Sequence, residues 1–151
     1  MNHVRKHSAG FLLDNAMSPV VCQQIITAFR VMKGEDGTSA GLDKIRRLRE
    51  NADYFRQRLI DDGFDVFGSF GSPVIPVMIY NPTKVAAFSR ECLARNLAVV
   101  VVGFPATPLT MARARFCISA GHTRDELDRA FKIVQEVATK LRLRYKRSVI
   151  G

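Results

Sequence analysis

The chain has 151 residues, of which 47% are hydrophobic and 25% charged, a composition that indicates a single globular domain and excludes a disordered segment. The longest apolar run, residues 97–102, is far shorter than the roughly 18 to 20 residues that a membrane helix requires. The first residues mix His, Arg and Lys with no apolar stretch behind them, which is unlike a signal peptide. We therefore expect a soluble piece of chain.

Basic residues outnumber acidic residues by 23 to 14, which gives a net charge of +9. Most of these charges alternate in sign along helix-like stretches, a pattern typical of a solvated helix face. One dense basic cluster without acids lies near the end of the chain, at residues 140–147. Since no nucleic-acid motif accompanies it, we expect no nucleic-acid partner and only a contribution to solubility or weak attraction to an acidic membrane.

Two helices are predicted in the first part of the chain. Residues 1–18 carry no clear periodicity, and we interpret them as an extended lead-in. Ser18 and Pro19 have the order of a helix N-cap and a first helical residue, and Gly34 is a natural end for that helix. A longer helix is predicted by an apolar stripe that stops before Gly63 and consists of Leu42, Ile45, Leu48, Ala52, Phe55 and Leu59.

Short strands follow, and we expect them at residues 64–68, 72–80, 97–102 and 113–119. Pro76 confines the second strand to an edge or a bulge, because proline lacks the N–H that a central strand donates. The wholly apolar run at 97–102 is expected to be the most buried strand. A helix begins at Asn81-Pro82, and a capping box of Thr123 and Glu126 begins the last helix.

This order of elements predicts an α+β fold in which helices cover one face of a small, mostly antiparallel sheet. Residues 19–151 are expected to form one domain, preceded by the lead-in at residues 1–18. We find no internal repeat, no linker and no spacing of His, Cys or acidic residues that is typical of a metal site. The pattern also offers no catalytic base or nucleophile.

The strand at residues 113–119 carries the one constellation that could bind a ligand. Because side chains alternate along a strand, Ala114 and Phe116 share one face, while Arg113 and Arg115 share the other. A guanidinium held by a strand is a good receptor for a planar carboxylate, since it offers two parallel N–H groups. From the pattern alone, however, a solvated pair of surface arginines is the favoured interpretation.

A proline-rich loop at residues 103–108 comes shortly before this strand. Its two prolines fix the backbone and remove two N–H donors, so the loop keeps its shape without regular secondary structure. Loops of this kind often line binding sites, although many are only rigid connections.

Six ordered blocks resemble the α-oxoamine synthases, the fold-type I acyltransferases that depend on pyridoxal 5′-phosphate (PLP). They are GEDGT at 34–38, SPVIPVMIYNP at 72–82, AFSREC at 87–92, VVVVGFPATP at 99–108, ARARFCIS at 112–119 and GHT at 121–123. The GFPATP loop is most similar to the serine palmitoyltransferase branch of the family, in particular to its second, catalytic subunit. The matching region of the family is the small C-terminal domain.

The resemblance implies a reaction in which L-serine condenses with palmitoyl-CoA to give 3-ketodihydrosphingosine, with PLP as the electron sink. In the family, a lysine in a T-x-S-K-S motif of the large domain binds PLP covalently, and the chain lacks this motif. We therefore expect a fragment that contains no catalytic residue, is inactive alone and does not bind PLP covalently.

The resemblance also assigns roles to residues. Arg115 matches the family arginine that pairs with the carboxylate of the amino-acid substrate. The mobile loop that shapes the acyl side of the family's active site matches Phe104, Pro105, Ala106, Thr107 and Pro108. In the family, hydroxyl residues reach the PLP phosphate of the partner subunit. Residues 14–16 replace them here, and Asn15 is the one weak candidate among these for a hydrogen bond.

The resemblance to the serine palmitoyltransferase branch also implies pairing with a second subunit, as a heterodimer or a homodimer, on the cytosolic face of the endoplasmic reticulum membrane. Two alternatives stay open. One is a sister enzyme that forms aminolevulinate, 8-amino-7-oxononanoate or 2-amino-3-ketobutyrate. The other is a non-catalytic interaction domain, since the first subunit of the serine palmitoyltransferase family is itself inactive.

Overall fold

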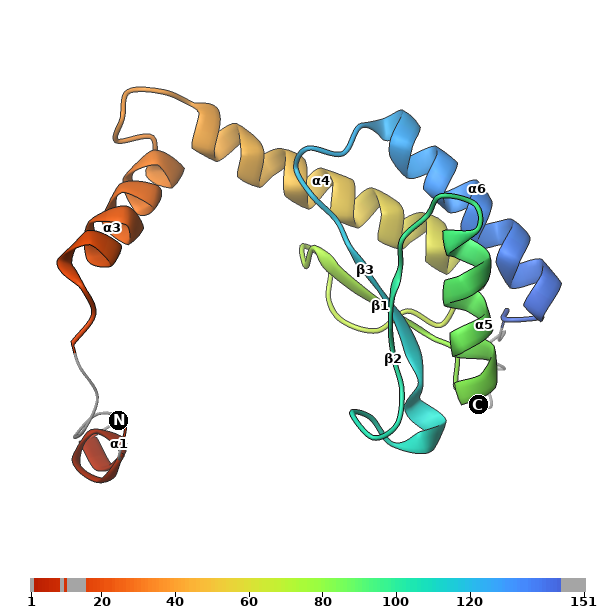
Figure 1. The fold of residues 1–151 in the computed structure, drawn as a ribbon. Helices are drawn as coiled ribbons and strands as arrows, with labels where there is room; N and C mark the ends of the chain where they lie inside the picture. The colour runs from red at the N-terminus through yellow and green to blue at the C-terminus, as the bar shows by residue number, and fades with distance from the viewer. Residues whose placement is uncertain (1, 9, 11–15, 145–151) are drawn as a thin grey trace, which may run out of the picture. The chain divides into compact units, whose positions relative to one another are not determined.

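The computed structural model describes residues 2–8, 10 and 16–144 (Figure 1). Contacts divide the chain into two compact units, residues 1–43 and 44–151, with the boundary inside helix α4 (Ala40–Asp61). The domain limits expected from the sequence, 1–18 and 19–151, stay a prediction, and each unit is described here by itself.

The first unit contains α1 (Asn2–His7) and α3 (Pro19–Lys33). The extended lead-in that we expected is wrong for residues 2–7, which form the short helix α1. This stretch contains no glycine or proline that would interrupt a helix. Within this helix Nδ1 of the His7 ring donates a hydrogen bond to the His3 carbonyl at 3.0 Å, and the two rings stack. Residues 16–18 are non-helical, and Asn15, the candidate for a phosphate contact, lies outside the described residues.

Helix α3 begins and ends as predicted. Pro19 occupies the first turn, and Gly34 ends the helix in the left-handed conformation (φ 76°), where its N–H reaches the last carbonyls. The apolar side chains of α3 lie exposed rather than buried, as Phe29 does with 58% of its surface accessible. Helix α3 therefore contributes no buried residue to the core of the described chain.

The second unit is built on an antiparallel sheet with the strand order β1-β3-β2. Its strands are β1 (Val74–Met78), β2 (Val100–Val102) and β3 (Arg113–Cys117). Pro76 lies on the edge strand β1, as predicted. The expectation that residues 97–102 are the most buried strand is wrong, because β2 is the other edge and Val100 is 52% exposed. Residues 64–68 form only an isolated bridge, Val66 to Val77.

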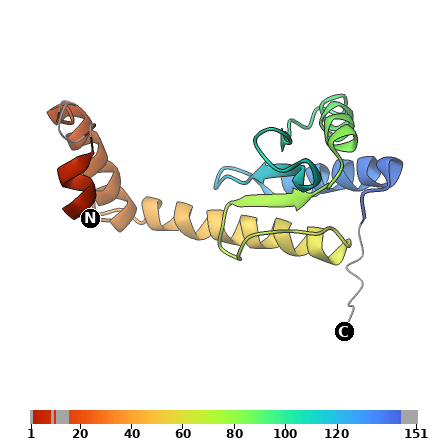
Figure 2. The same ribbon diagram turned by 90° about the horizontal axis from the view of Figure 1, so that it is seen from below.

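Helices α4, α5 (Pro82–Leu93) and α6 (Arg124–Leu141) supply the other side of the core. Phe116 of β3 lies with its ring 5.5 Å from that of Phe55 on α4 and 6.5 Å from that of Phe88 on α5. Phe131 of α6 packs edge-on against Phe55 at 6.4 Å. In Figure 2, α6 lies between α4 and α5. The predicted small antiparallel sheet with helices on the face of Phe116 is confirmed.

The basic residues near the C-terminus are partly paired in the fold. The Lys140 ammonium lies 2.7 Å from a carboxylate oxygen of Glu91 on α5, and Arg144 lies 2.9 Å from Asp62. Since acids from other elements offset these charges, the cluster is less available to a membrane than its sequence indicates. Among the described residues, no helix is both long enough and apolar enough to cross a membrane.

The capping box at the start of α6 gives a first testable prediction. The Thr123 hydroxyl accepts a bond from the Glu126 N–H at 3.3 Å, and the Glu126 carboxylate accepts one from the Thr123 N–H at 2.8 Å. We expect Thr123→Ala to lower the free energy of unfolding by about 1 kcal/mol, measured by denaturant melting of the full-length protein. An unchanged midpoint would contradict a stabilising cap.

This cap also depends on pH. Bonds from Thr123 lower the pKa of Glu126 from its ordinary value of 4.5. A lowered carboxyl pKa stabilises the fold above the ordinary value, and this stabilisation is lost as the pH falls through the lower, folded value. The difference in unfolding free energy between wild type and Thr123→Ala should therefore shrink as the pH falls below 4.5.

Candidate functional site

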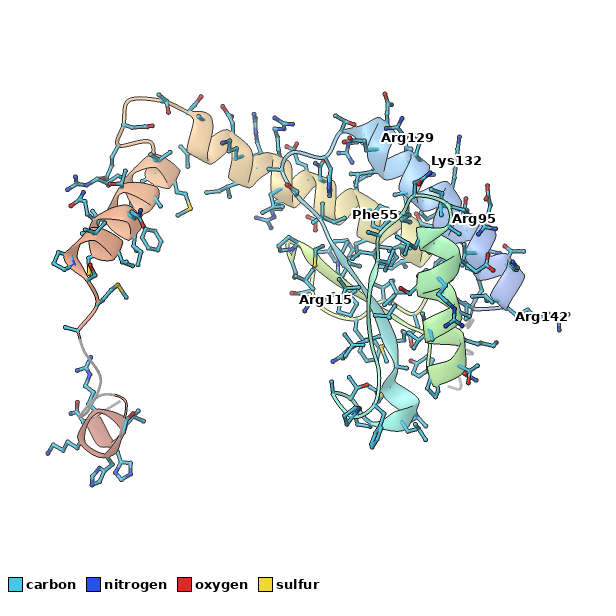
Figure 3. The ribbon with its side chains drawn as sticks, in the orientation of Figure 1. Phe55, Arg95, Arg115, Arg129, Lys132 and Arg142 are labelled. Carbon is cyan, nitrogen blue, oxygen red and sulfur yellow. The ribbon has the colours of Figure 1, made fainter. Side chains whose placement is uncertain are left out.

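Arg115 lies at the middle of the sheet, because β3 pairs with β1 along its whole length and with β2 over its first half. Burial alternates along β3 as the sequence predicted: Ala114 and Phe116 are buried, whereas Arg115 and Cys117 are exposed. In Figure 3 the Arg115 side chain projects from the sheet on the side away from α5. The pairing of β3 with β1 and β2 thus fixes the backbone of Arg115 and leaves its guanidinium accessible.

The guanidinium of Arg115 makes no hydrogen bond or ion pair with the residues that the structure describes. Its cross-strand neighbours are apolar, Pro76 on β1 and Val100 on β2. Some other arginines of this unit are committed: Arg95 lies 2.7 Å from Glu91, and the buried Arg56 donates to the Phe67 carbonyl at 2.7 Å. An uncommitted guanidinium on a central strand is a ready receptor for a carboxylate.

Arg113 shares the face of Arg115 and lies about 7 Å away by the rise of a strand. It is half-buried, and its cross-strand partners are Met78 and Val102. Arg113 is therefore nearer the proline-rich loop, whereas Arg115 is the more accessible of the two guanidinium groups.

The loop at residues 103–108 connects β2 to the short helix η1 (Leu109–Met111), which leads into β3. Phe104 is 70% exposed, and its peptide bond to Pro105 is cis. Pro105, Ala106 and Pro108 are exposed as well. Thr107 alone turns inward: it is buried, and its N–H donates to the Gly103 carbonyl at 3.2 Å. The loop therefore presents Phe104 outward while Thr107 holds it to the domain.

Tyr80 is a residue of this region that sequence reasoning missed. It adopts a left-handed backbone (φ 60°), which is unfavourable for a bulky residue. In this conformation the N–H groups of Ile79 and Tyr80 both reach the Ala112 carbonyl, each at 2.9 Å. The two residues after β1 thus bind the backbone of Ala112, the last residue before β3. They fix the point at which the chain leaves the loop and enters β3. The Asn81-Pro82 helix start directly after Tyr80 was the only sequence signal for a sharp turn there.

His122 has a packing role in this structure. Its Nδ1 accepts a bond from the Ser119 N–H at 3.2 Å, and the Asn51 amide donates to the carbonyls of Ser119 and His122. These bonds tie the segment between β3 and α6 to α4. Within residues 2–8, 10 and 16–144, no cluster of three His, Cys or acidic side chains could hold a metal ion.

A family model described as aminotransferase class I and II matches residues 1–134 of the chain. The chain belongs to this family. Solved structures agree on the fold: a structure of serine palmitoyltransferase with PLP covers 94% of the chain with a TM-score of 0.75 at 22% identity. An 8-amino-7-oxononanoate synthase from Francisella tularensis covers 92% of the chain with a TM-score of 0.66. Curated relatives that are 45 to 54% identical to the chain, named as serine palmitoyltransferases and a long chain base biosynthesis protein, confirm the resemblance to the α-oxoamine synthases.

Curated relatives are more similar in sequence. Serine palmitoyltransferase 2 of Dictyostelium discoideum is 47% identical over 96% of the chain, and long chain base biosynthesis protein 2a of Arabidopsis thaliana is 54% identical over 82%. Serine palmitoyltransferase 3 of Homo sapiens is 45% identical over 97%. The chain spans 25 to 30% of the length of these relatives.

The buried hydroxyl of Thr107 gives a second prediction. Its Oγ1 has no hydrogen-bond partner among the described residues, and an unpartnered buried hydroxyl costs about 1 to 3 kcal/mol. Valine has the same shape without the hydroxyl, so Thr107→Val should raise the melting temperature of the full-length protein. Thr107→Ser keeps the hydroxyl and removes a methyl group, and it should lower that temperature. A lower melting temperature for Thr107→Val would show that the hydroxyl has a partner in the whole protein.

Proposed function

We propose that this chain is the small-domain part of a serine palmitoyltransferase, which condenses L-serine with palmitoyl-CoA to 3-ketodihydrosphingosine in sphingolipid biosynthesis. The uncommitted guanidinium of Arg115, within the matching ARARFCIS block, is the observation that carries the proposal. The names of the relatives, at 45 to 54% identity, support the choice of this branch over its sister enzymes.

Arg115 would bind and orient the amino acid. A guanidinium donates two parallel N–H bonds to one carboxylate, which fixes the plane and the direction of that group. The orientation of the carboxylate decides which bond at Cα is positioned to break. Because β3 is held on both sides by β1 and β2, the position of Arg115 is set by the sheet rather than by a loop.

The loop at residues 103–108 would form a wall of the same site. Phe104, Pro105, Ala106 and Pro108 present apolar surface outward, while Thr107 anchors the loop. Such a surface suits the acyl side of the site and excludes water from the reacting groups. The anchoring at Ala112 keeps this wall beside β3.

PLP supplies the electron sink of the proposed reaction. Among the described residues, every lysine is exposed or half-buried, so none has the enclosed surroundings of a lysine that holds such a cofactor. The residues present fit a substrate-side wall of the site, and a lysine elsewhere in the full-length protein would hold PLP. Asn15, which lies outside the described residues, stays the weak candidate for a phosphate contact that the sequence offers.

We further propose that the full-length protein pairs with a second subunit, as a heterodimer or homodimer, and acts at the cytosolic face of the endoplasmic reticulum. The relatives named as serine palmitoyltransferases support this assignment. L-serine and palmitoyl-CoA are the substrates that the proposal implies.

A third prediction tests Arg115. Arg115→Ala in the full-length enzyme should lower kcat/KM for L-serine by about 100-fold or more, because a charged pair with the substrate carboxylate is lost. Arg113→Ala is the matched control, since it removes a guanidinium from the same face of the same strand. It should change kcat/KM only a few-fold. Equal effects of the two substitutions would contradict a carboxylate role specific to Arg115.

A fourth prediction separates the proposed branch from its sister enzymes. The full-length protein should release CoA from palmitoyl-CoA with L-serine as the second substrate, and much more slowly with glycine or L-alanine. The assay measures free thiol with each amino acid in turn. Activity with glycine alone would assign the chain to a sister enzyme and overturn the proposed function.

A further inference from the structure

The proline-rich loop and Arg115 are held by the fold in different ways. Arg115 lies on β3, whose backbone pairs with β1 along its whole length and with β2 over its first half. The loop at residues 103–108 lies outside every strand that the structure describes, and in Figure 1 the chain from β2 to β3 turns at the lower end of the sheet. A contact at the exit of the loop can therefore place the loop without placing Arg115.

The exit of the loop is Ala112, whose carbonyl accepts the N–H groups of Ile79 and Tyr80, each at 2.9 Å. These two bonds are made with Tyr80 in the left-handed conformation (φ 60°). A bulky residue keeps such a backbone only where its surroundings enforce it. The hold on Ala112 therefore depends on whatever fixes Tyr80.

The side chain of Tyr80 has such a fixing contact, because its hydroxyl donates a hydrogen bond to the carboxylate of Asp65. Asp65 is itself held at the edge of β1 that faces away from β3, where its carbonyl accepts the Met78 N–H at 2.9 Å. The Phe67 N–H donates to the Pro76 carbonyl, also at 2.9 Å, on the same edge. The bond between the two side chains is partly buried, and reduced access of water strengthens it.

We propose that Tyr80 and Asp65 are positioning residues that place the proline-rich loop for the acyl substrate, whereas the sheet alone places Arg115 for the amino acid. Asp65 holds the Tyr80 ring, the Tyr80 backbone holds Ala112, and Ala112 ends the loop. Without the bond between the side chains, Tyr80 can relax to a more favourable backbone, and its N–H leaves Ala112. The link to the acyl substrate rests on the proposed function, but the hold on the loop does not.

Two substitutions break the pair with little other change. Tyr80→Phe removes only the hydroxyl and keeps the ring. Asp65→Ala removes the carboxylate and keeps the backbone carbonyl that accepts from Met78. Melting temperatures of the full-length variants check that they fold, and Asp65→Ala carries the same test if Tyr80→Phe does not fold.

Hydrogen exchange of the full-length protein, measured by mass spectrometry of its peptides, tests the hold on the loop without any substrate. In both variants, peptides that cover residues 103–112 should exchange at least about fivefold faster than in wild type, because local opening of this segment becomes easier. Peptides that cover residues 113–117 should exchange as in wild type, since β1 and β2 still pair with β3.

Tyr54→Phe is the matched control. Tyr54 and Asp128 form another tyrosine–aspartate pair of the same unit, in which the hydroxyl donates at 2.6 Å, but this pair joins α4 to α6. Its loss should leave exchange at residues 103–112 unchanged. Asp65→Asn keeps an oxygen that accepts from the Tyr80 hydroxyl, so this variant should retain the protection of wild type.

Steady-state kinetics on the same preparations test the link to the acyl substrate. Tyr80→Phe and Asp65→Ala should each raise the KM for palmitoyl-CoA by about fivefold and leave the KM for L-serine within about twofold of wild type. The double variant should be no worse than either single variant, because a shared contact is lost only once. Additive effects would overturn the pair as one unit.

Unchanged exchange at residues 103–112 in both variants, or an equal effect of Tyr54→Phe, would overturn the positioning role. Faster exchange with an unchanged KM for palmitoyl-CoA, or with an equal rise for both substrates, would overturn the link to the acyl substrate. Faster exchange in a protein that does not use serine would support the hold on the loop and remove only the proposed function.

Discussion

Packing of Phe116 against the rings of Phe55 and Phe88 decides which way β3 faces, and the candidate site depends on that choice. Side chains alternate along a strand, so burying Phe116 turns Arg115 to the opposite face. A slip of one residue would bury the arginine and expose the ring, which the apolar core makes very unfavourable. The pairing of β3 on both sides makes such a slip more costly still. Apolar packing on one face is thus the physical basis of a polar receptor on the other.

The proline-rich loop is held in a comparable way, by backbone contacts at both ends. At one end Val102 pairs with Arg113 across the sheet, and at the other the N–H groups of Ile79 and Tyr80 converge on the Ala112 carbonyl. Thr107 fills a buried position between these ends. The exposed Phe104 is therefore carried on a segment whose two ends are held beside β3. One short stretch of chain thus joins the apolar loop at residues 103–108 to Arg115, the candidate receptor for a carboxylate.

A cavity of about 570 Å³ lies beside β3 and has a different origin, the unequal length of the two edge strands. Because β2 ends early, three segments that lie far apart in the sequence line one space, and α6 brings Arg129 to it. The same helix is tied down by its capping box and by the pair of Lys140 with Glu91. These contacts stabilise the first and the last turn of α6.

Local rules explain the features that could be predicted. Pro19 and Gly34 mark helix ends through their backbone conformation, Asn81 and Thr123 do so through side-chain oxygens that accept from backbone N–H groups, and each lies where it was expected. The alternation along β3 is equally local. Strand 97–102 was misjudged, because its hydrophobicity says nothing about which strand lies at the centre of the sheet. The short helix α1 was missed because six residues give too little periodicity to read.

The sequence by itself determined the helix ends, the two faces of β3 and the membership of the α-oxoamine synthase family, since each follows from nearby residues or from ordered motifs. Only the tertiary structure decided that Arg115 has no partner among the described residues, that Tyr80 holds the exit of the loop and that a cavity lies beyond β2. These properties depend on which distant residues become neighbours. A guanidinium is available or paired according to what the fold brings beside it, and no local pattern carries that information.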